Sequence, residues 1–245
     1  MISIRHLTKT LGTQQVLRGI DLEIATGETC VILGRSGCGK SVLLKHLIGL
    51  FQPTAGEVWI EGEEISRLPE RKLGGIRKKV GMLFQSAALF DSMNVEENLA
   101  FPLREAGVKN EGEIRDRVAE ALEMVDLAGE QKKMPEKLSG GMRKRVGLAR
   151  TIVGRPACIL YDEPTTGLDP IASDSINHLI RRLQKRLHVT SVVVTHDMRT
   201  AFTTADRIAF LHEGGIYFHG TADALKAAVD PVITDFIEGR SGDVS

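Results

Sequence analysis

A glycine-rich segment follows an apolar run near the start of the sequence. It consists of Gly34, Arg35, Ser36, Gly37, Cys38, Gly39, Lys40 and Ser41. The spacing is G-x-x-x-x-G-K-[ST], in which glycines let consecutive backbone N–H groups point at a chain of phosphates. The predicted helix that follows adds the partial positive charge of its N-terminus. Lys40 is therefore expected to reach the β- and γ-phosphates of a nucleoside triphosphate, and the Ser41 hydroxyl to bind Mg²⁺.

Two carboxylates end a later apolar run. Asp162 and Glu163 follow the run CILY and precede Pro164. A carboxylate at the tip of a buried strand can face Mg²⁺ directly or through water, which is the role predicted for Asp162. Glu163 is predicted to polarise the attacking water as a general base. Without other motifs, the pair is equally consistent with a turn that ends the strand. The presence of the phosphate loop favours the catalytic interpretation.

Polar residues also follow two other apolar runs. Gln85 comes after VGMLF and can reach Mg²⁺ or the attacking water from a strand tip. His196 comes after SVVVT, and a neutral imidazole there could hydrogen-bond the γ-phosphate. A lone histidine is more often structural, and a lone glutamine more often a surface residue. Their predicted roles therefore depend on the motifs around them.

A second glycine-containing loop precedes the helical stretch RKRVGLARTIV. Ser139, Gly140 and Gly141 stand at its start within LSGGM. A glycine pair at a helix N-terminus makes another anion-binding end, although by itself it could simply be a helix cap. This loop has no lysine suited to holding a triphosphate. It is therefore predicted to close over a nucleotide held by a partner chain.

The apolar patterns predict an α/β fold. Alternating residues in the first 60 or so positions are typical of an antiparallel sheet. Continuous short runs are typical of parallel strands covered on both faces, and they occur at 29–34, 80–84, 158–161, 191–195 and 207–211. Helical spacing is found at 41–50, throughout a mostly helical insertion at about 85–156, and at 176–187, where a helix separates two strands as a crossover. The last five residues, SGDVS, are predicted to be disordered.

Composition narrows the class of protein. The 245 residues suit one large α/β domain, or a core with a smaller subdomain. Lys+Arg and Asp+Glu both count 32, so the basic excess of a nucleic-acid-binding protein is missing and no nucleic-acid partner is expected. No run approaches the roughly 20 apolar residues that span a bilayer, and no signal peptide is predicted. A cytoplasmic location is expected, with Cys30, Cys38 and Cys158 reduced.

Together these motifs resemble the nucleotide-binding domains of ABC transporters. The corresponding motifs are GRSGCGKS (Walker A), Gln85 (Q-loop), LSGGM (signature), CILYDE (Walker B), TGLD ending at Asp169 (D-loop) and His196 (switch histidine). The resemblance covers about residues 1–225. It implies a single P-loop ATPase domain with these parts: a RecA-like parallel-sheet core with an N-terminal antiparallel β subdomain at 1–85 and 157–225, a helical subdomain at 86–156, and a C-terminal tail at 226–245.

The same resemblance implies partners. Two copies would form a head-to-tail homodimer with two ATP molecules and Mg²⁺ at the interface. Each ATP would be held by one subunit's Walker motifs and by Ser139 and Gly141 of the other. An integral membrane permease would dock near Gln85 and the helical insertion, placing the chain peripherally on the cytoplasmic face of the inner membrane.

Two positions depart from the family pattern. Where the family has an aromatic residue that stacks on adenine, this chain has Leu11 followed by Gly12, and Arg5 or His6 are alternatives for that contact. The fifth signature residue is Met142 in place of glutamine. The serine and glycines of the signature are intact, so a tuned site is expected and not an inactive one.

A finer resemblance is to the ATPases of Mla-type (Mce-associated) lipid transporters. It rests on GRSGCGKSVLLKHLIGL, SAALFDSMNVEENLAFPL, the methionine signature, DEPTTGLDPI and DPVITDFIEG. It implies a phospholipid or similar hydrophobic cargo moved between inner and outer membranes, and a Mce-type lipid-binding partner. Amino-acid importer and lipoprotein-release ATPases share many of these residues and remain alternatives. A soluble ABC ATPase is another alternative, which the single cassette and the absence of a CxxC pair disfavour. A non-hydrolysing regulatory cassette is a further one, which the intact Glu163 and His196 disfavour.

Overall fold

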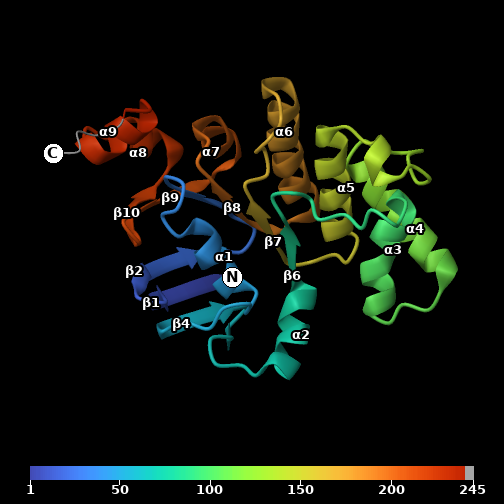
Figure 1. Cartoon of the computed structure of the whole chain (residues 1–245), viewed down its shortest axis with the longest axis horizontal. Coiled ribbons are helices and arrows are strands. Elements are labelled where there is room, and N and C mark those ends of the chain that lie inside the picture. Colours follow the sequence, from blue (N-terminus) through green and yellow to red (C-terminus); the bar gives the residue numbers. More distant parts are fainter. Residues whose placement is uncertain (241–245) are drawn as a thin grey trace. The chain divides into compact units, whose positions relative to one another are not determined.

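The computed structural model describes residues 1–240, so the disorder predicted for 241–245 lies outside the described residues. The chain forms two compact units, and Figure 1 labels their helices and strands. The first contains Met1–Leu73 and the chain from Thr190 onward, and the second contains Gly74–Val189. The domain boundaries predicted from the sequence stay a prediction.

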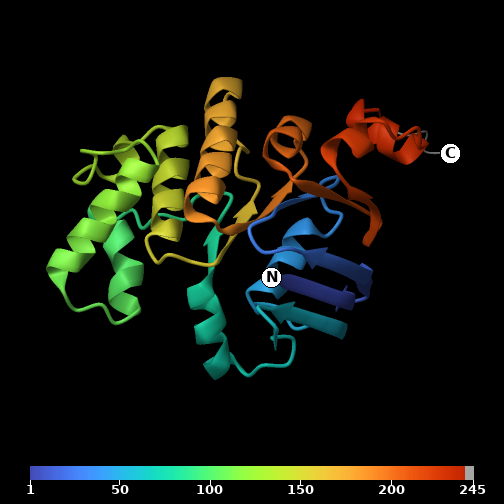
Figure 2. The same ribbon diagram turned by 180° about the vertical axis from the view of Figure 1, so that it is seen from behind.

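The first unit contains the predicted antiparallel sheet, drawn in blue to cyan in Figure 2. Its strands are β1 (Ile2–Leu11), β2 (Gln14–Ile24), β4 (Ala55–Ile60) and β5 (Glu63–Glu64), in the order β2-β1-β4-β5. Alternate residues of β2 are buried: Leu17, Ile20, Leu22 and Ile24. The alternation confirms that one face of this sheet packs inward.

The first unit also contains parallel strands. β3 (Thr29–Leu33) pairs in parallel with β8 (Thr190–Thr195) and with β9 (Arg207–His212), and β10 (Gly215–Gly220) runs antiparallel to β9. Every residue of β3 and β8 is buried, as their unbroken apolar runs predict. The helices of this unit are α1 (Lys40–Leu47), α7 (Met198–Thr204), α8 (Ala222–Lys226) and α9 (Pro231–Ile237).

α1 is shorter than the sequence predicts. The apolar pattern continues to Leu50, whereas the helix ends at Leu47. The backbone N–H groups of Leu50 and Phe51 both donate to the Lys45 carbonyl oxygen, at 2.9 and 3.2 Å. These bonds close the last turn and direct the chain away from the helix axis.

The second unit is mainly helical. Its parallel strands β6 (Val80–Leu83) and β7 (Cys158–Asp162) pair with Leu83 opposite Tyr161. α2 (Glu70–Lys79) leads into β6, and the other helices are α3 (Val95–Glu105), α4 (Glu111–Met124), the short 3₁₀ helix η1 (Pro135–Lys137), α5 (Gly140–Ile152) and α6 (Pro170–Leu187). α3, α4 and α5 pack on one another (Figure 1). The helical insertion and the crossover helix are therefore present as predicted.

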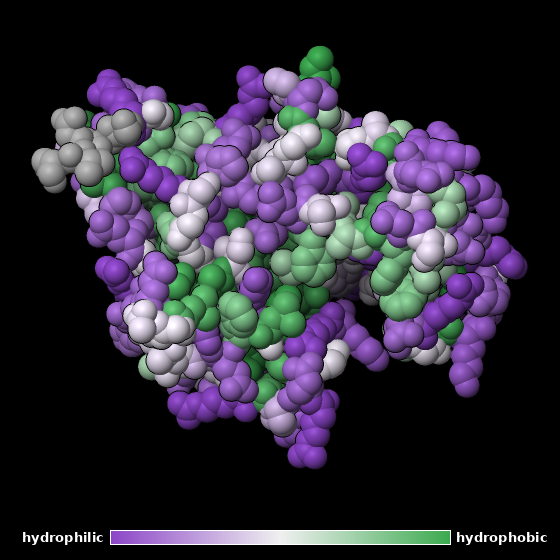
Figure 3. Space-filling model, viewed as in Figure 1, coloured by the Kyte–Doolittle hydropathy of each residue, from purple (hydrophilic) through white to green (hydrophobic). Residues whose placement is uncertain are grey.

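The surface over α3 and α4 is largely hydrophilic on the face drawn in Figure 3, with a few apolar residues between. Within the described part of the chain, no helix is both long enough and apolar enough to cross a membrane. All three cysteines are free thiols, as predicted.

His46 on α1 is expected to make stability depend on pH. Its side chain is 1% exposed, and its Nδ1 lies 2.8 Å from the Val42 carbonyl oxygen. Burial lowers the pKa of His46 below its usual 6.5, and the charge of Lys9 lowers it further. The unfolded chain therefore binds a proton at a higher pH than the folded chain does.

The free energy of unfolding is expected to fall as pH drops below about 6.5 and to level off below the folded-state pKa of His46. Denaturant titrations from about pH 8 to about pH 5 should show a shallower dependence in His46→Leu, and equal slopes would contradict this assignment.

Candidate functional site

The phosphate loop lies between β3 and α1. Gly39 precedes the helix with φ at +107°, and a side chain there would come within 2.9 Å of Leu17 and 3.2 Å of Val16 on β2. Glycine is thus required by both backbone angle and space. Lys40 is 6% exposed, and its Nζ donates to the carbonyl oxygens of Gly34 (2.8 Å) and Arg35 (3.0 Å). The loop folds around its own lysine and leaves 35–37 exposed.

His196 and the phosphate loop follow two neighbouring strands that end at the same edge of the sheet. β3 and β8 are parallel neighbours with Leu33 opposite Thr195, so Gly34 and His196 each come directly after paired residues. His196 is exposed. The next residue, Asp197, caps α7 by accepting the N–H groups of Arg199 and Thr200. The structure therefore brings the candidate histidine beside the phosphate loop.

In the second unit, β6 and β7 bring Gln85 to the same edge as Asp162 and Glu163. Leu83 is opposite Tyr161, so the three candidate residues follow paired positions. Gln85 is exposed and the two carboxylates are half-buried. Glu163 has φ at +49°, and its Oε2 accepts a hydrogen bond from the Thr166 hydroxyl at 3.3 Å. The predicted catalytic residues of this unit, like His196 and the phosphate loop in the first, lie at the carboxyl ends of a pair of parallel strands.

Lys144 belongs to this group of residues but was not predicted from the sequence. It lies on α5, is 5% exposed, and its Nζ donates to the backbone carbonyl oxygens of Gln85 and Glu163. Burial lowers the pKa of Lys144, while the charges of Glu163 and Asp162 oppose that shift. The spacing of Lys144 from Gly147 and Leu148 in the sequence is a signal that could have identified this lysine. That spacing places Lys144 on the same helix face as these two buried residues.

The signature and D-loop residues line one hollow of about 660 Å³ in the second unit. Ser139 is the N-cap of α5 and accepts the Met142 N–H at 3.3 Å; Gly140 and Gly141 open the helix. Asp169 caps α6 by accepting the Ile171 and Ala172 N–H groups. Ser139, Gly141, Met142 and Asp169 all face the hollow. The two motifs thus share a surface that includes the N-terminal ends of α5 and α6.

Two arginine side chains bind the same aspartate, Asp126, at the rim of this hollow. Arg145 on α5 and Arg182 on α6 both donate to Asp126 Oδ2, at 2.8 and 2.7 Å. These bonds lower the pKa of Asp126, with Arg182 the larger influence. Arg145 also donates to the Ser175 hydroxyl at 2.6 Å. The signature helix is therefore tied to the helix that follows the D-loop.

Leu11 is the last residue of β1 and is 40% exposed. Both alternatives for the adenine contact have other partners in the structure. The Arg5 guanidinium lies over the Trp59 ring at 5.4 Å, and His6 Nδ1 is 3.0 Å from Asp21 Oδ2. These contacts favour Leu11 as the candidate. Val16, beside Gly39, is a neighbouring apolar residue that the sequence did not single out.

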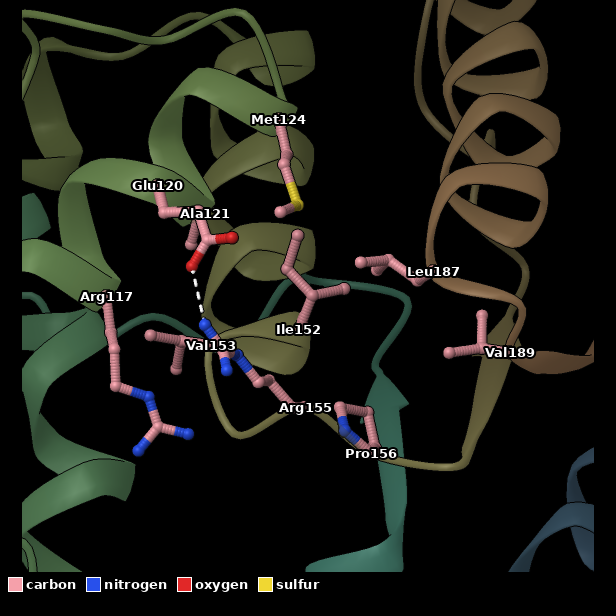
Figure 4. A pocket seen from close by; sticks show the side chains of 10 residues that line it. All are labelled: Arg117, Glu120, Ala121, Met124, Ile152, Val153, Arg155, Pro156, Leu187 and Val189. Carbon is pink, nitrogen blue, oxygen red and sulfur yellow. Dashed lines mark hydrogen bonds and ion pairs between the residues drawn. The ribbon is translucent and has the colours of Figure 1, made fainter.

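A separate hollow of about 190 Å³ lies among α4, the end of α5 and the end of α6 (Figure 4). Its walls are mainly apolar, and at its rim Arg155 donates to Glu120 Oε2 at 2.9 Å. None of the predicted phosphate-handling residues lines it. It is therefore not part of the candidate site.

The family model for the ABC transporter matches residues 17–166, which is more than half of the chain. The chain belongs to the ABC transporter family and is an ATPase with that family's P-loop fold. Among solved structures, it is similar to the dimeric ATP-binding cassette MJ0796 in a post-hydrolysis state bound to ADP and Pi. That match has 33% identity and a TM-score of 0.82, over 91% of this chain and 99% of that one.

Three curated relatives differ in the cargo that their names give. The chain is 43% identical over 239 residues to the probable ribonucleotide transport ATP-binding protein mkl of Mycobacterium leprae, covering 98% of this chain and 69% of that protein. It is 40% identical over 241 residues to the methionine import protein MetN of Carboxydothermus hydrogenoformans, covering 97% and 71%. It is 39% identical over 241 residues to the intermembrane phospholipid transport protein MlaF of Haemophilus influenzae, covering 98% and 91%.

Proposed function

We propose that this chain powers the movement of phospholipid, or a similar hydrophobic molecule, between inner and outer membranes through a separate permease. The observation that carries the proposal is the similarity to MlaF, which extends over nearly all of that protein. The methionine signature and the stretch SAALFDSMNVEENLAFPL, which resemble Mla-type ATPases, support the same cargo class. A Mce-type lipid-binding subunit is the corresponding partner.

The working form is proposed to be a homodimer that binds two ATP molecules. The phosphate loop contains Lys40, whereas the signature hollow presents Ser139 and the N-terminus of α5 without such a lysine. A hollow of about 660 Å³ can receive the phosphates of a nucleotide held by a second copy. The similar cassette MJ0796 is dimeric, which supports the same arrangement here.

The oxygen-bearing side chains of the proposed site fit a Mg²⁺ ion that arrives bound to ATP. Among the described residues, no group of three or more His, Cys, Asp or Glu side chains could hold a metal ion. Magnesium in such sites is commonly bound by only one or two carboxylates, and substrate phosphates and water supply most of its other ligands. Ser41, Asp162 and Gln85 would supply the protein oxygens. The bound ion would neutralise charge that develops on the phosphates during transfer.

The protein's own residues then carry out the chemistry. Lys40 and the N-terminus of α1 hold the phosphates in line for attack. The Glu163 carboxylate accepts a proton from water as the water oxygen bonds to the γ-phosphorus, and the bond from that phosphorus to the ADP oxygen breaks. His196 hydrogen-bonds the γ-phosphate. ADP and phosphate are the products, and their release would allow the dimer to open.

A permease would dock beside the Q-loop of the second unit. Three aromatic residues are exposed in this region: Phe84 immediately precedes Gln85, Phe90 lies in the segment between Gln85 and α3, and Phe101 lies on α3. The rings of Phe90 and Phe101 are 5.0 Å apart. Exposed aromatic side chains are enriched at protein interfaces. This docking would hold the chain at the cytoplasmic face of the inner membrane.

The cargo is tested on the complex recovered from membranes. The tagged chain is purified from detergent-solubilised membranes, and the complex is placed in proteoliposomes. Transfer of labelled phospholipid that requires ATP, together with a co-purified permease and lipid-binding subunit, is the expected result. ATP turnover stimulated by methionine or a ribonucleotide, with no lipid transfer, would overturn the cargo assignment. A wholly ribosome-bound or DNA-bound pool would overturn transport altogether.

A further inference from the structure

One face of α5 lies unusually close to the end of β6 and to the segment after it. A side chain at Gly147 would come within 2.9 Å of Leu83 and 3.0 Å of Ala87. One turn further on, the Thr151 hydroxyl donates to the Met82 carbonyl oxygen at 3.3 Å. The signature helix and the Q-loop segment are therefore in direct contact, and the absence of a side chain at Gly147 allows this approach.

Lys144 stands on this face, one turn before Gly147. Its Nζ donates to the carbonyl oxygens of Gln85 and, at 3.4 Å, of Glu163. A buried charge is costly unless it is hydrogen-bonded and balanced by an opposite charge. The negative charges of Glu163 and Asp162 offset part of that cost. A single ammonium group thus binds the peptide groups of two candidate site residues.

The backbone at Glu163 and in the segment after Gln85 needs such support. Glu163 has φ at +49°, and Ala87 and Ala88, just after Gln85, have φ at +62° and +47°. Residues other than glycine adopt this left-handed region only when the surroundings hold them there. Arg150 on α5 donates to the carbonyl oxygens of Ala87 (2.9 Å) and Ala88 (2.8 Å). Lys144 and Arg150 together fix the Q-loop from the same helix face.

We propose that Lys144 is a positioning residue for ATP hydrolysis, which holds the main chain of Glu163 and Gln85 to the helix that begins with the signature glycines. This inference rests on the proposed roles of Glu163 and Gln85. Because α5 begins at Gly140, a displacement of the signature helix pulls on both peptide groups through one side chain. Engagement of the signature by a partner's nucleotide is thereby linked to the orientation of the general base within the same subunit.

The test replaces the ammonium group in the full-length chain. Lys144→Met keeps an unbranched side chain that reaches to Cε but removes the ammonium group, and Lys144→Arg retains a positive charge and N–H donors. Lys185→Met removes an exposed lysine from α6 and serves as the matched control. For Lys144→Met, kcat is expected to fall at least about tenfold, because small displacements of catalytic groups are costly. The KM and the Kd for ATP are expected to stay within about twofold, since a residue that acts on the chemical step alters kcat.

Two further readouts separate positioning from a merely structural role. Lys144→Arg is expected to recover most of the lost kcat, and Lys185→Met to match the wild type. Hydrogen exchange in Lys144→Met is expected to accelerate in segments 84–90 and 163–168, with the strands of the first unit unchanged.

The inference is overturned if Lys144→Met hydrolyses ATP like the wild type, or if Lys144→Arg is as slow as Lys144→Met. It is also overturned if Lys144→Met loses ATP affinity, stability and turnover together. If Lys144→Met hydrolyses ATP like the wild type, Glu163→Gln shows whether the proposed general-base role of Glu163 fails together with the positioning role of Lys144. An inactive Glu163→Gln leaves the proposed general base standing, whereas an active one removes that role as well.

Discussion

Glu163→Gln is expected to lower the rate of ATP hydrolysis at least about 100-fold, the typical contribution of a general base. Glutamine has the same shape as glutamate but cannot accept the proton of the attacking water. It can still accept a hydrogen bond from Thr166, so the left-handed turn at 163 should persist. ATP binding is therefore expected to be intact. Steady-state phosphate release and equilibrium ATP binding on the same preparation measure the two effects separately.

A matched carboxylate provides the control for this variant. Glu120 lies in the same unit at the rim of the small apolar hollow, where it pairs with Arg155 (Figure 4). Glu120→Gln makes the same chemical change away from the candidate site and is expected to hydrolyse ATP at the wild-type rate. Wild-type turnover in Glu163→Gln would remove the general-base assignment.

Modification of Cys38 with a bulky maleimide is expected to abolish ATP binding, and bound ATP is expected to protect the thiol. Cys38 is half-buried within the phosphate loop, and its backbone N–H donates to the Arg35 carbonyl oxygen at 3.3 Å. A large adduct there would occupy the space in which the loop must receive phosphates. Labelling followed by mass spectrometry and an ATP-binding assay measures both the site and the consequence.

The other two cysteines should not interfere with this experiment. Cys30 and Cys158 are buried, and burial raises the pKa of Cys30 to about 12, which leaves almost no reactive thiolate. A variant with Cys30→Ala and Cys158→Ala is expected to lose ATP binding on labelling just as the wild type does. Normal ATP binding by a chain fully labelled at Cys38 would contradict the placement of the phosphate loop.

Much of the fold is predictable because burial in a parallel sheet is a local property of the sequence. Residues 30–33 of β3 form an unbroken apolar run, and all five residues of the strand are buried. The polar residue that follows such a run must emerge at the carboxyl edge of the sheet. For that reason the sequence alone assigns His196, Gln85 and Asp162 to strand ends, and likewise Gly34, which opens the phosphate loop.

Contacts between distant segments were not predictable in the same way. Lys144 and Gln85 are 59 residues apart, and their bond depends on how closely α5 packs against β6. The left-handed backbone of Glu163 is likewise held by neighbours and not by its own residue type. The end of α1 depends on which carbonyl accepts the last N–H groups, a choice that an apolar pattern does not encode. Sequence patterns therefore located the candidate residues, and tertiary packing defines how they are supported.

The most direct test of the divided active site is the mass of Glu163→Gln in solution with and without ATP, measured by sedimentation or light scattering. A site that needs Lys40 from one copy and Ser139 from another predicts a monomer without nucleotide and a dimer with ATP. Adding Ser139→Arg, which fills the signature hollow, should keep the chain monomeric while its own phosphate loop still binds ATP. A Glu163→Gln chain that stays monomeric when saturated with ATP would contradict the account.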